Sequence, residues 1–247
     1  MAKDLFSNQS SLYARYRPTY PPELFDYILS YVVRKNFAWD CATGNGQAAV
    51  ALAPHFNKVY ATDISKKQLQ QAVPVKNIEY AVASEQTTDI PENTIDLITV
   101  AQAYHWFDFD GFYREAIRVS HARTVVAVWG YSLVICDDET INSQLDFFYK
   151  QTVGHYWDQE RKHVDARYAT VSFPFDELPA PEFKIHVDWK REDFIGYINT
   201  WSSVQNFIKV NKSNPVDEFA KELISIWKEE AAKHFYFPLF LRIGNVY

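Results

Sequence analysis

The sequence is poor in the residue types that mark several specialised classes of protein. Its 247 residues include two cysteines and one methionine. Two cysteines allow at most one disulfide, so we expect Cys41 and Cys136 to be free, buried thiols rather than parts of a disulfide framework. No segment is long and apolar enough to predict a membrane-spanning helix, and the N-terminal residues lack the apolar run of a signal peptide. The composition therefore predicts a soluble, cytoplasmic protein without a membrane partner.

Long basic runs are also missing, and the formal net charge is −6. The pairs Lys66–Lys67 and Lys209/Lys212 are isolated, so we expect no nucleic-acid partner. His155 and His163 lie eight residues apart with nothing to complete a metal site, and we expect no metal. The sequence does not distinguish a monomer from a homodimer.

Short apolar segments alternate with helical patterns through the first half of the chain. This alternation with short connections is typical of a doubly wound parallel sheet. The expected strands cover 36–40, 58–65, 78–84, 94–102 and 123–131, and the expected helices cover 21–33, 47–55, 66–73 and 111–120.

After Tyr131 the pattern becomes polar and aromatic, and we expect helical cap elements within 137–235. Two late segments, 183–189 and 237–247, are expected to be strands that rejoin the sheet. No linker divides the chain. The prediction is therefore a single α/β domain over 1–247, with a Rossmann-like, seven-stranded, mostly parallel sheet. Its core is 21–131 plus the late strands, with a helical cap over the ligand edge.

The stretch "WDCATGNGQAAV", residues 39–50, is typical of a strand, a tight turn and a helix start. Gly44 and Gly46 allow the backbone to approach a ligand closely. Asp63, at the end of the next strand, suits a pair of ribose hydroxyls. Both NAD and S-adenosylmethionine carry that ribose, so these residues alone leave the two cofactors open.

Three further features favour S-adenosylmethionine. The carboxylate of Asp40, four residues before Gly44, would face the pyrophosphate of a dinucleotide, whereas S-adenosylmethionine carries an ammonium and a sulfonium. Glu85 follows the third strand in "VASEQ" and suits the adenine edge. His105 and Trp106, in "AQAYHWFD", would lie beside the transferred group.

Together these motifs resemble the class I S-adenosylmethionine-dependent methyltransferases, of the small-molecule, type 11-like group related to trans-aconitate methyltransferase. The resemblance covers residues 5–131 through "YARYRPTYP", "DCATGNGQ", "YATDIS" and "AQAYHWFD". It continues more weakly through "INTWSSV" and "FPLFLRIG". "YRPTYP" together with "AQAYHWFD" is more specific than the glycine turn.

The resemblance implies S-adenosylmethionine as cofactor, S-adenosylhomocysteine as product, and an N-terminal segment, 5–20, that closes over the cofactor. Ala42 of this chain stands where members of the family usually have the first glycine of the turn. The implied cofactor-binding residues are Asp40, Ala42, Gly44 and Gly46 in the turn, Asp63 and Ile64 at the ribose, Ala83, Ser84 and Glu85 at the adenine, Ala101 and Gln102 behind the methionine part, and Tyr13, Tyr16 and Arg17 in the N-terminal segment.

Several residues admit two interpretations. His105 is either a base near its normal pKa or a packing histidine, and Trp106 is a pocket wall; we assign both to acceptor positioning. Arg17 and Arg242 could bind a carboxylate, although a surface ion pair is favoured for Arg242. Trp129 either lines the acceptor side, with Tyr131, or belongs to the core.

The predicted reaction is in-line methyl transfer to a small organic acceptor, with a carboxylate as one candidate group. The acceptor itself is not specified by the sequence, and the cap is expected to select it. Two alternatives stay open: a nicotinamide-dependent oxidoreductase on a similar fold, and a non-catalytic cofactor-binding module.

Overall fold

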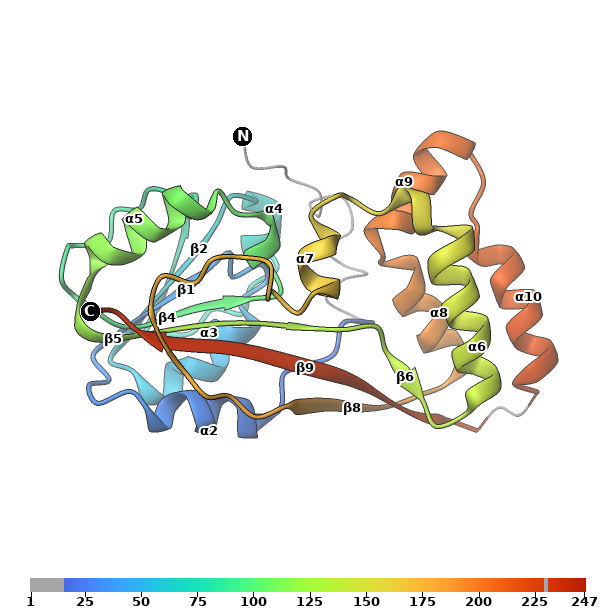
Figure 1. The fold of residues 1–247 in the computed structure, drawn as a ribbon, viewed down its shortest axis with the longest axis horizontal. Coiled ribbons are helices and arrows are strands. Elements are labelled where there is room, and N and C mark those ends of the chain that lie inside the picture. Colours follow the sequence, from blue (N-terminus) through green and yellow to red (C-terminus); the bar gives the residue numbers. More distant parts are fainter. Residues whose placement is uncertain (1–15, 229–230) are drawn as a thin grey trace.

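A computed structural model describes residues 16–228 and 231–247, and in them nine strands form one sheet (Figure 1). Along the sheet the strand order is β3-β2-β1-β4-β5-β9-β6, and β7 and β8 also pair with β9. The strands are β1 (Phe37–Cys41), β2 (Lys58–Asp63), β3 (Ile78–Val82), β4 (Ile95–Ala101), β5 (Ser120–Tyr131), β6 (Ile135–Cys136), β7 (Asp176–Leu178), β8 (Phe183–Trp189) and β9 (Lys233–Asn245).

Strands β1 to β5 pair in parallel, in the order that a doubly wound sheet requires. In β4 the first six of seven residues are buried, as expected for a strand covered on both faces. Helices α2 and α3 lie on one side of these strands, and α5 on the other (Figure 1). The bounds are α2 (Pro22–Ser30), α3 (Gln47–Leu52) followed by the 3₁₀ turn η2 (Ala53–His55), α4 (Lys66–Leu69), η3 (Tyr104–Trp106) and α5 (Phe109–Val119).

The second half of the chain adds an antiparallel strand and a group of helices. Strand β9 runs antiparallel to β5 and β8 and reaches from the parallel sheet to the helical group (Figure 1). The helical elements are α6 (Glu139–Phe147), the π-helical turn η4 (Phe148–Thr152), η5 (Gly154–Tyr156), α7 (Arg161–Asp165), α8 (Arg191–Asn199), α9 (Ser202–Asn211) and α10 (Val216–Ile226).

The predicted fold class is confirmed, and the differences lie at element boundaries. Strands β6 and β7 were not predicted, and β9 begins at Lys233 because its first residues pair with β8 and β6. The helix predicted at 21–33 ends at Ser30, so Val33 is 77% exposed instead of joining the apolar stripe. The helix predicted at 66–73 is limited to α4.

The core consists of two clusters, one on each face of the sheet. The first joins α2 and α3 to the cap helices, and the second joins α5 to the segment around Phe173. Trp129 is fully buried in the first cluster, with its ring 6.0 Å from that of Phe25. Of its two interpretations, the core one is therefore confirmed.

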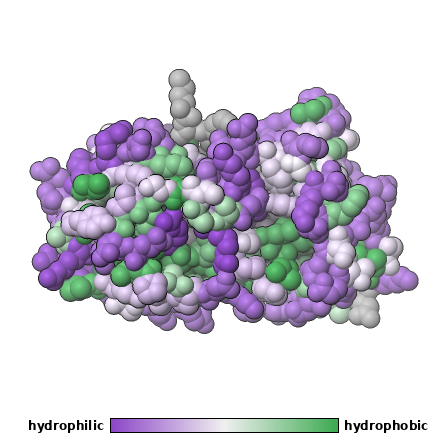
Figure 2. Space-filling model, viewed as in Figure 1, coloured by the Kyte–Doolittle hydropathy of each residue, from purple (hydrophilic) through white to green (hydrophobic). Residues whose placement is uncertain are grey.

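The surface seen in Figure 2 is largely hydrophilic, with hydrophobic residues gathered in separate patches over both halves. None of the described helices has the length and apolarity needed to span a membrane.

Candidate active site

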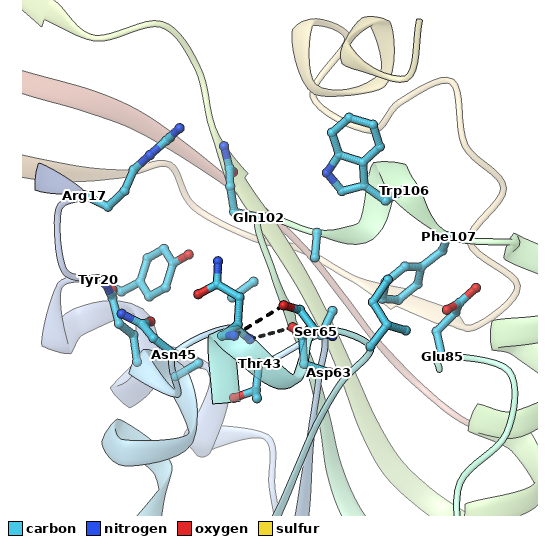
Figure 3. A pocket seen from close by; sticks show the side chains of 18 of the residues that line it. Arg17, Tyr20, Thr43, Asn45, Asp63, Ser65, Glu85, Gln102, Trp106 and Phe107 are labelled. Carbon is cyan, nitrogen blue, oxygen red and sulfur yellow. Dashed lines mark hydrogen bonds between the residues drawn. The ribbon is translucent and has the colours of Figure 1, made fainter. Parts of the chain in front are cut away.

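A cavity opens at the carboxyl ends of the parallel strands, and its empty space, with the open solvent at its mouth included, is about 1090 Å³. Segments that follow β1, β2, β3 and β4 all contribute to its lining. Figure 3 shows Asp63 and Ser65 on its floor, Arg17 and Tyr20 on one side, and Phe107 and Glu85 on the opposite side. A doubly wound sheet binds its ligand at this edge, so the cavity is the expected place for a cofactor.

The structure brings most of the predicted cofactor residues together in this lining. Those present are Arg17, Ala42, Gly44, Asp63, Ile64, Ala83, Glu85, Ala101 and Gln102, together with Trp106. Asp40, Gly46, Ser84 and Tyr16 lie outside the lining, and Tyr13 lies outside the described residues. Pro18 and Tyr20, from the predicted N-terminal segment, and Tyr131, a candidate for the acceptor side, also line the cavity. The lining residues that sequence reasoning did not assign are Thr43, Asn45, Gln47, Ala48, Ser65, Gln68, Ala103 and Phe107. Most of them adjoin a predicted residue within the same motif, and that adjacency was the available signal.

The two glycines of the first turn have different roles. Gly44 has a φ of +59°, and a Cβ placed there would meet no atom within 4 Å, so its backbone faces open space. Gly46 has a φ of +87°, and a Cβ there would lie 2.6 Å from the hydroxyl oxygen of Tyr80. Gly46 is therefore needed for packing against β3, while Gly44 leaves the backbone accessible to a ligand.

Asp40 lies beneath the turn rather than in the cavity lining. It is fully buried, and its carboxylate accepts hydrogen bonds from the hydroxyls of Thr43 and Thr99 and from the N–H of Ala49. Burial raises the pKa of Asp40 to about 6, against the lowering effect of these three donors. The structure thus gives Asp40 the task of fixing the turn and the start of α3, instead of the direct ligand contact that we expected.

Asp63, at the end of β2, connects the first turn to the second. One carboxylate oxygen accepts from the N–H of Gly44 at 2.8 Å, and the other accepts from the N–H of Ser65 at 2.7 Å. A carboxylate offers about four lone-pair sites in all. Because Asp63 also lines the cavity, it is held rigidly in place and can accept hydrogen bonds from a ligand.

Glu85 and Gln102 are also fixed by the backbone around them. Glu85 is 6% exposed and accepts from the N–H of Asp108 at 3.2 Å. Gln102 has a φ of +54°, and its side-chain oxygen accepts from the N–H of Tyr131 at 2.9 Å. The side chain of Gln102 thus joins the separating ends of β4 and β5 at the cavity wall.

The N-terminal segment contributes Arg17 to the cavity. The guanidinium of Arg17 donates to the hydroxyl of Tyr131 at 2.6 Å and lies over the ring of Tyr197 at 5.3 Å. Tyr16 packs instead against α8, where a Cβ on Gly196 would meet its ring at 2.5 Å. Of the two, only Arg17 reaches the place that the resemblance implies for the segment.

A second cavity adjoins the first on the side of the cap, and its empty space, with open solvent included, is about 610 Å³. The two cavities share four lining residues, which are Arg17, Gln102, Trp106 and Tyr131. The remaining lining of the second cavity includes His105 and residues of the cap around α7 and α8. The four shared residues therefore mark the boundary between a space at the sheet edge and a space under the cap.

His105 is buried, and its Nδ1 lies 3.1 Å from the hydroxyl of Tyr168. Burial, with smaller contributions from the charges of Arg161 and His163, lowers the pKa of His105 to about 3. The expectation that His105 is a base near its normal pKa is therefore wrong. The neutral imidazole is a weak base, and its contact with Tyr168 supports the packing interpretation.

This shift predicts a pH dependence of stability. The pKa of His105 falls from 6.5 to about 3 on folding. The contribution of neutral His105 to the free energy of unfolding is therefore complete above pH 6.5. It is lost as the pH falls below 6.5, because the unfolded state binds the proton before the folded state does. At pH 5 the loss is about 2 kcal/mol. Urea unfolding of His105→Gln should show a smaller loss between pH 8 and pH 5 than the parent; equal losses would contradict the assignment.

The backbone conformation at Ala42 predicts that its replacement by glycine stabilises the fold. Its φ of +56° is left-handed, which costs a non-glycine residue roughly 1–2 kcal/mol, partly offset by the greater freedom of glycine when unfolded. We expect Ala42→Gly to stabilise the chain by about 1 kcal/mol, or about 2–4 °C in Tm. The matched change Gly44→Ala, at a φ of +59°, should lower Tm. A lower Tm for Ala42→Gly would refute this reading of the turn.

Two further expectations are confirmed. Arg242 forms an ion pair with Glu177 at 2.8 Å and lies outside both cavity linings, as the ion-pair interpretation predicts. Cys41 and Cys136 are free and buried.

Comparisons with known proteins show the family of this chain. A family model described as a methyltransferase domain matches residues 39–128, which contain the turn, Asp63 and the shared Gln102 and Trp106. A Dictyostelium discoideum protein named as a methyltransferase is 33% identical over 228 residues, which are 91% of this chain and 87% of that protein.

Solved structures show the same relationship. A structure from Anaeromyxobacter dehalogenans, described as that of a type II methyltransferase, superposes with a TM-score of 0.85 and 35% identity, over 93% of this chain and 97% of the other. The YcgJ protein of Bacillus subtilis shares the fold, with a TM-score of 0.51 and 15% identity over 90% of this chain and 97% of its own. The chain thus belongs to the class I S-adenosylmethionine-dependent methyltransferases.

Proposed function

We propose that this methyltransferase binds S-adenosylmethionine in the first cavity and methylates a carboxylate of a small organic acid that enters from the second. The observation that carries the proposal is the set of four residues shared by the two cavities. A methyl group must pass between cofactor and acceptor in a line, and two adjoining spaces with a common boundary provide that arrangement.

The residues of the first cavity fit the cofactor. The Asp63 carboxylate, held at the cavity floor by Gly44 and Ser65, suits the two ribose hydroxyls, and Glu85 with Phe107 suits the adenine. The open backbone at Gly44 and the segment Ala101–Gln102 would adjoin the methionine part. When bound, the cofactor would supply an electrophilic methyl group.

A nicotinamide dinucleotide is less well supported by the same geometry. Its pyrophosphate would need the free N–H groups of the glycine turn. In this chain the N–H of Gly44 already donates to Asp63 at 2.8 Å, which brings a carboxylate to that place. Repulsion between this carboxylate and a phosphate would oppose binding.

The pKa of His105 favours an acceptor that needs no base. A histidine with a pKa of about 3 takes up a proton poorly at neutral pH. A carboxylate is already ionised there, and one of its oxygens can form the new bond to the methyl carbon without losing a proton. Arg17, at the boundary of the cavities, would hold the acid. The chain's own task is then orientation, which contributes roughly 7–11 kcal/mol in favourable cases.

Transfer of a labelled methyl group tests the proposal. The full chain is incubated with methyl-labelled S-adenosylmethionine and small carboxylic acids, with the corresponding carboxamides as controls. We expect label in base-labile esters of the acids and none in the carboxamides. Label in the carboxamides but not in the acids, or in neither while S-adenosylhomocysteine still binds, would refute the carboxylate acceptor and leave the cofactor assignment in place.

A further inference from the structure

The second cavity has an unusual lining of aromatic rings and guanidinium groups. Five rings, those of Trp106, Tyr131, Trp157, Tyr197 and Trp201, contribute to it. The centroids of Trp157 and Trp201 lie 5.5 Å apart, so the rings of the cap pack on one another and form a stiff wall. Aromatic walls of this kind favour a flat, apolar ligand body.

Two cations accompany these rings. Arg161 lies over the ring of Trp157 at 4.7 Å, and Arg17 lies over the ring of Tyr197 at 5.3 Å. Burial raises the pKa of the Tyr197 hydroxyl, and the charges of Arg17 and Arg161 both act against that rise. Arg17, Arg161 and Tyr197 all line this one cavity. Asp158 is the single acidic side chain among the described lining residues, so the lining has an excess of positive charge.

Arg161 is held in place through one side of its guanidinium. Its Nε donates to Asp165 and to the hydroxyl of Tyr149, each at 3.1 Å, and the side chain is 18% exposed. Within residues 16–228 and 231–247, its two terminal nitrogens form no hydrogen bond. A fixed guanidinium with its terminal N–H groups available matches the geometry of a carboxylate.

From this arrangement we propose that the second cavity binds an aromatic or conjugated carboxylic acid, whose flat body lies against the tryptophans and whose carboxylate is bound by Arg161 together with Arg17. This inference rests on the proposed function and goes further, because it names the class of acceptor and makes Arg161 a residue that determines specificity.

Calorimetric titration of the full chain, saturated with S-adenosylhomocysteine, tests the inference with three probes. These are trans-cinnamate, its neutral amide, and 3-cyclohexylpropanoate, which keeps the charge and loses the flat ring. We expect cinnamate to bind, and the other two to bind at least tenfold more weakly. Failure of cinnamate to bind, or equal binding of the cyclohexyl acid, would overturn the proposal.

Variants of Arg161 test its role. Arg161→Gln should weaken cinnamate binding at least tenfold, and Arg161→Lys should recover part of the loss. The matched control is Arg167→Gln, which removes a surface guanidinium that pairs with Glu182 outside both cavities and should change nothing. Unchanged cinnamate binding in Arg161→Gln would overturn the assignment.

Binding of S-adenosylhomocysteine distinguishes a failure of the proposed function from a failure of the acceptor class. Arg161 does not line the first cavity, so S-adenosylhomocysteine should bind to Arg161→Gln as to the parent, which also shows that the variant is folded. If that variant does not fold, Arg161→Lys and the probes on the parent chain decide. If the parent chain does not bind S-adenosylhomocysteine, the proposed function is refuted. If the parent chain binds S-adenosylhomocysteine but not cinnamate, only the acceptor class is refuted.

Discussion

Asp63→Ala should weaken the binding of S-adenosylhomocysteine by about 30- to 1000-fold, as measured by calorimetry. The carboxylate lines the cavity and is oriented by the N–H groups of Gly44 and Ser65. Removal would delete the two charge-assisted hydrogen bonds that we propose to the ribose hydroxyls, and it releases the glycine turn from β2. Each such bond contributes roughly 1.5–3 kcal/mol to binding, and water that replaces the carboxylate recovers part of this. The net loss of binding free energy is about 2–4 kcal/mol.

Two controls separate ligand contact from damage to the turn. Asp188→Ala removes an exposed carboxylate on β8, outside the cavity, and should leave the affinity unchanged. Asp63→Asn keeps the shape and one accepting oxygen, so it should fall between Asp63→Ala and the parent. Parental affinity in a folded Asp63→Ala variant would show that the ribose does not lie at Asp63.

Asp40→Ala should have the largest effect on stability, a loss of about 2–4 kcal/mol in urea unfolding at pH 8. The carboxylate of Asp40 satisfies three donors in a fully buried place: the two threonine hydroxyls of Thr43 and Thr99, and the N–H of Ala49. Alanine leaves them buried without an acceptor, at about 1–3 kcal/mol for each group that finds no other partner.

Asp40→Asn is the matched control for that loss. An amide oxygen can accept from Ala49 and Thr43, while its NH₂ can donate to a reoriented Thr99 hydroxyl. The pKa of about 6 shows that the ionised form gains less from its donors than burial costs. The neutral isostere should therefore lose much less stability than Asp40→Ala. Equal losses for the two variants would mean that the negative charge itself is needed.

The parallel half of the fold was predictable because its signals are local. A polar residue follows each of the five parallel strands within two positions, and β4 is buried along almost its whole length. Boundaries were less certain where pairing between distant segments decides them. Strand β9 begins at Lys233 because the first residues of this strand pair with β8 and β6. No local pattern around Lys233 specifies those partners.

The site residues also divide into those placed by local sequence signals and those placed by contacts between distant segments. Gly44, Asp63 and Glu85 lie at or just after the ends of strands whose carboxyl ends meet at one edge of the sheet, so their place could be predicted from the alternation alone. The position of Asp40 beneath the turn depends on Thr99, which is 59 residues away along the chain. The low pKa of His105 depends on burial by segments such as Tyr168, in a part of the cap where the sequence carries little signal.

The most direct test of the account is calorimetric titration of the parent chain with S-adenosylhomocysteine and, separately, with NADH. Our assignment of the first cavity predicts one strong site for S-adenosylhomocysteine, sensitive to Asp63→Ala, and no binding of NADH. Binding of NADH with no binding of S-adenosylhomocysteine would contradict the account, because the cavity formed by the turn, Asp63 and Glu85 would then hold a different cofactor.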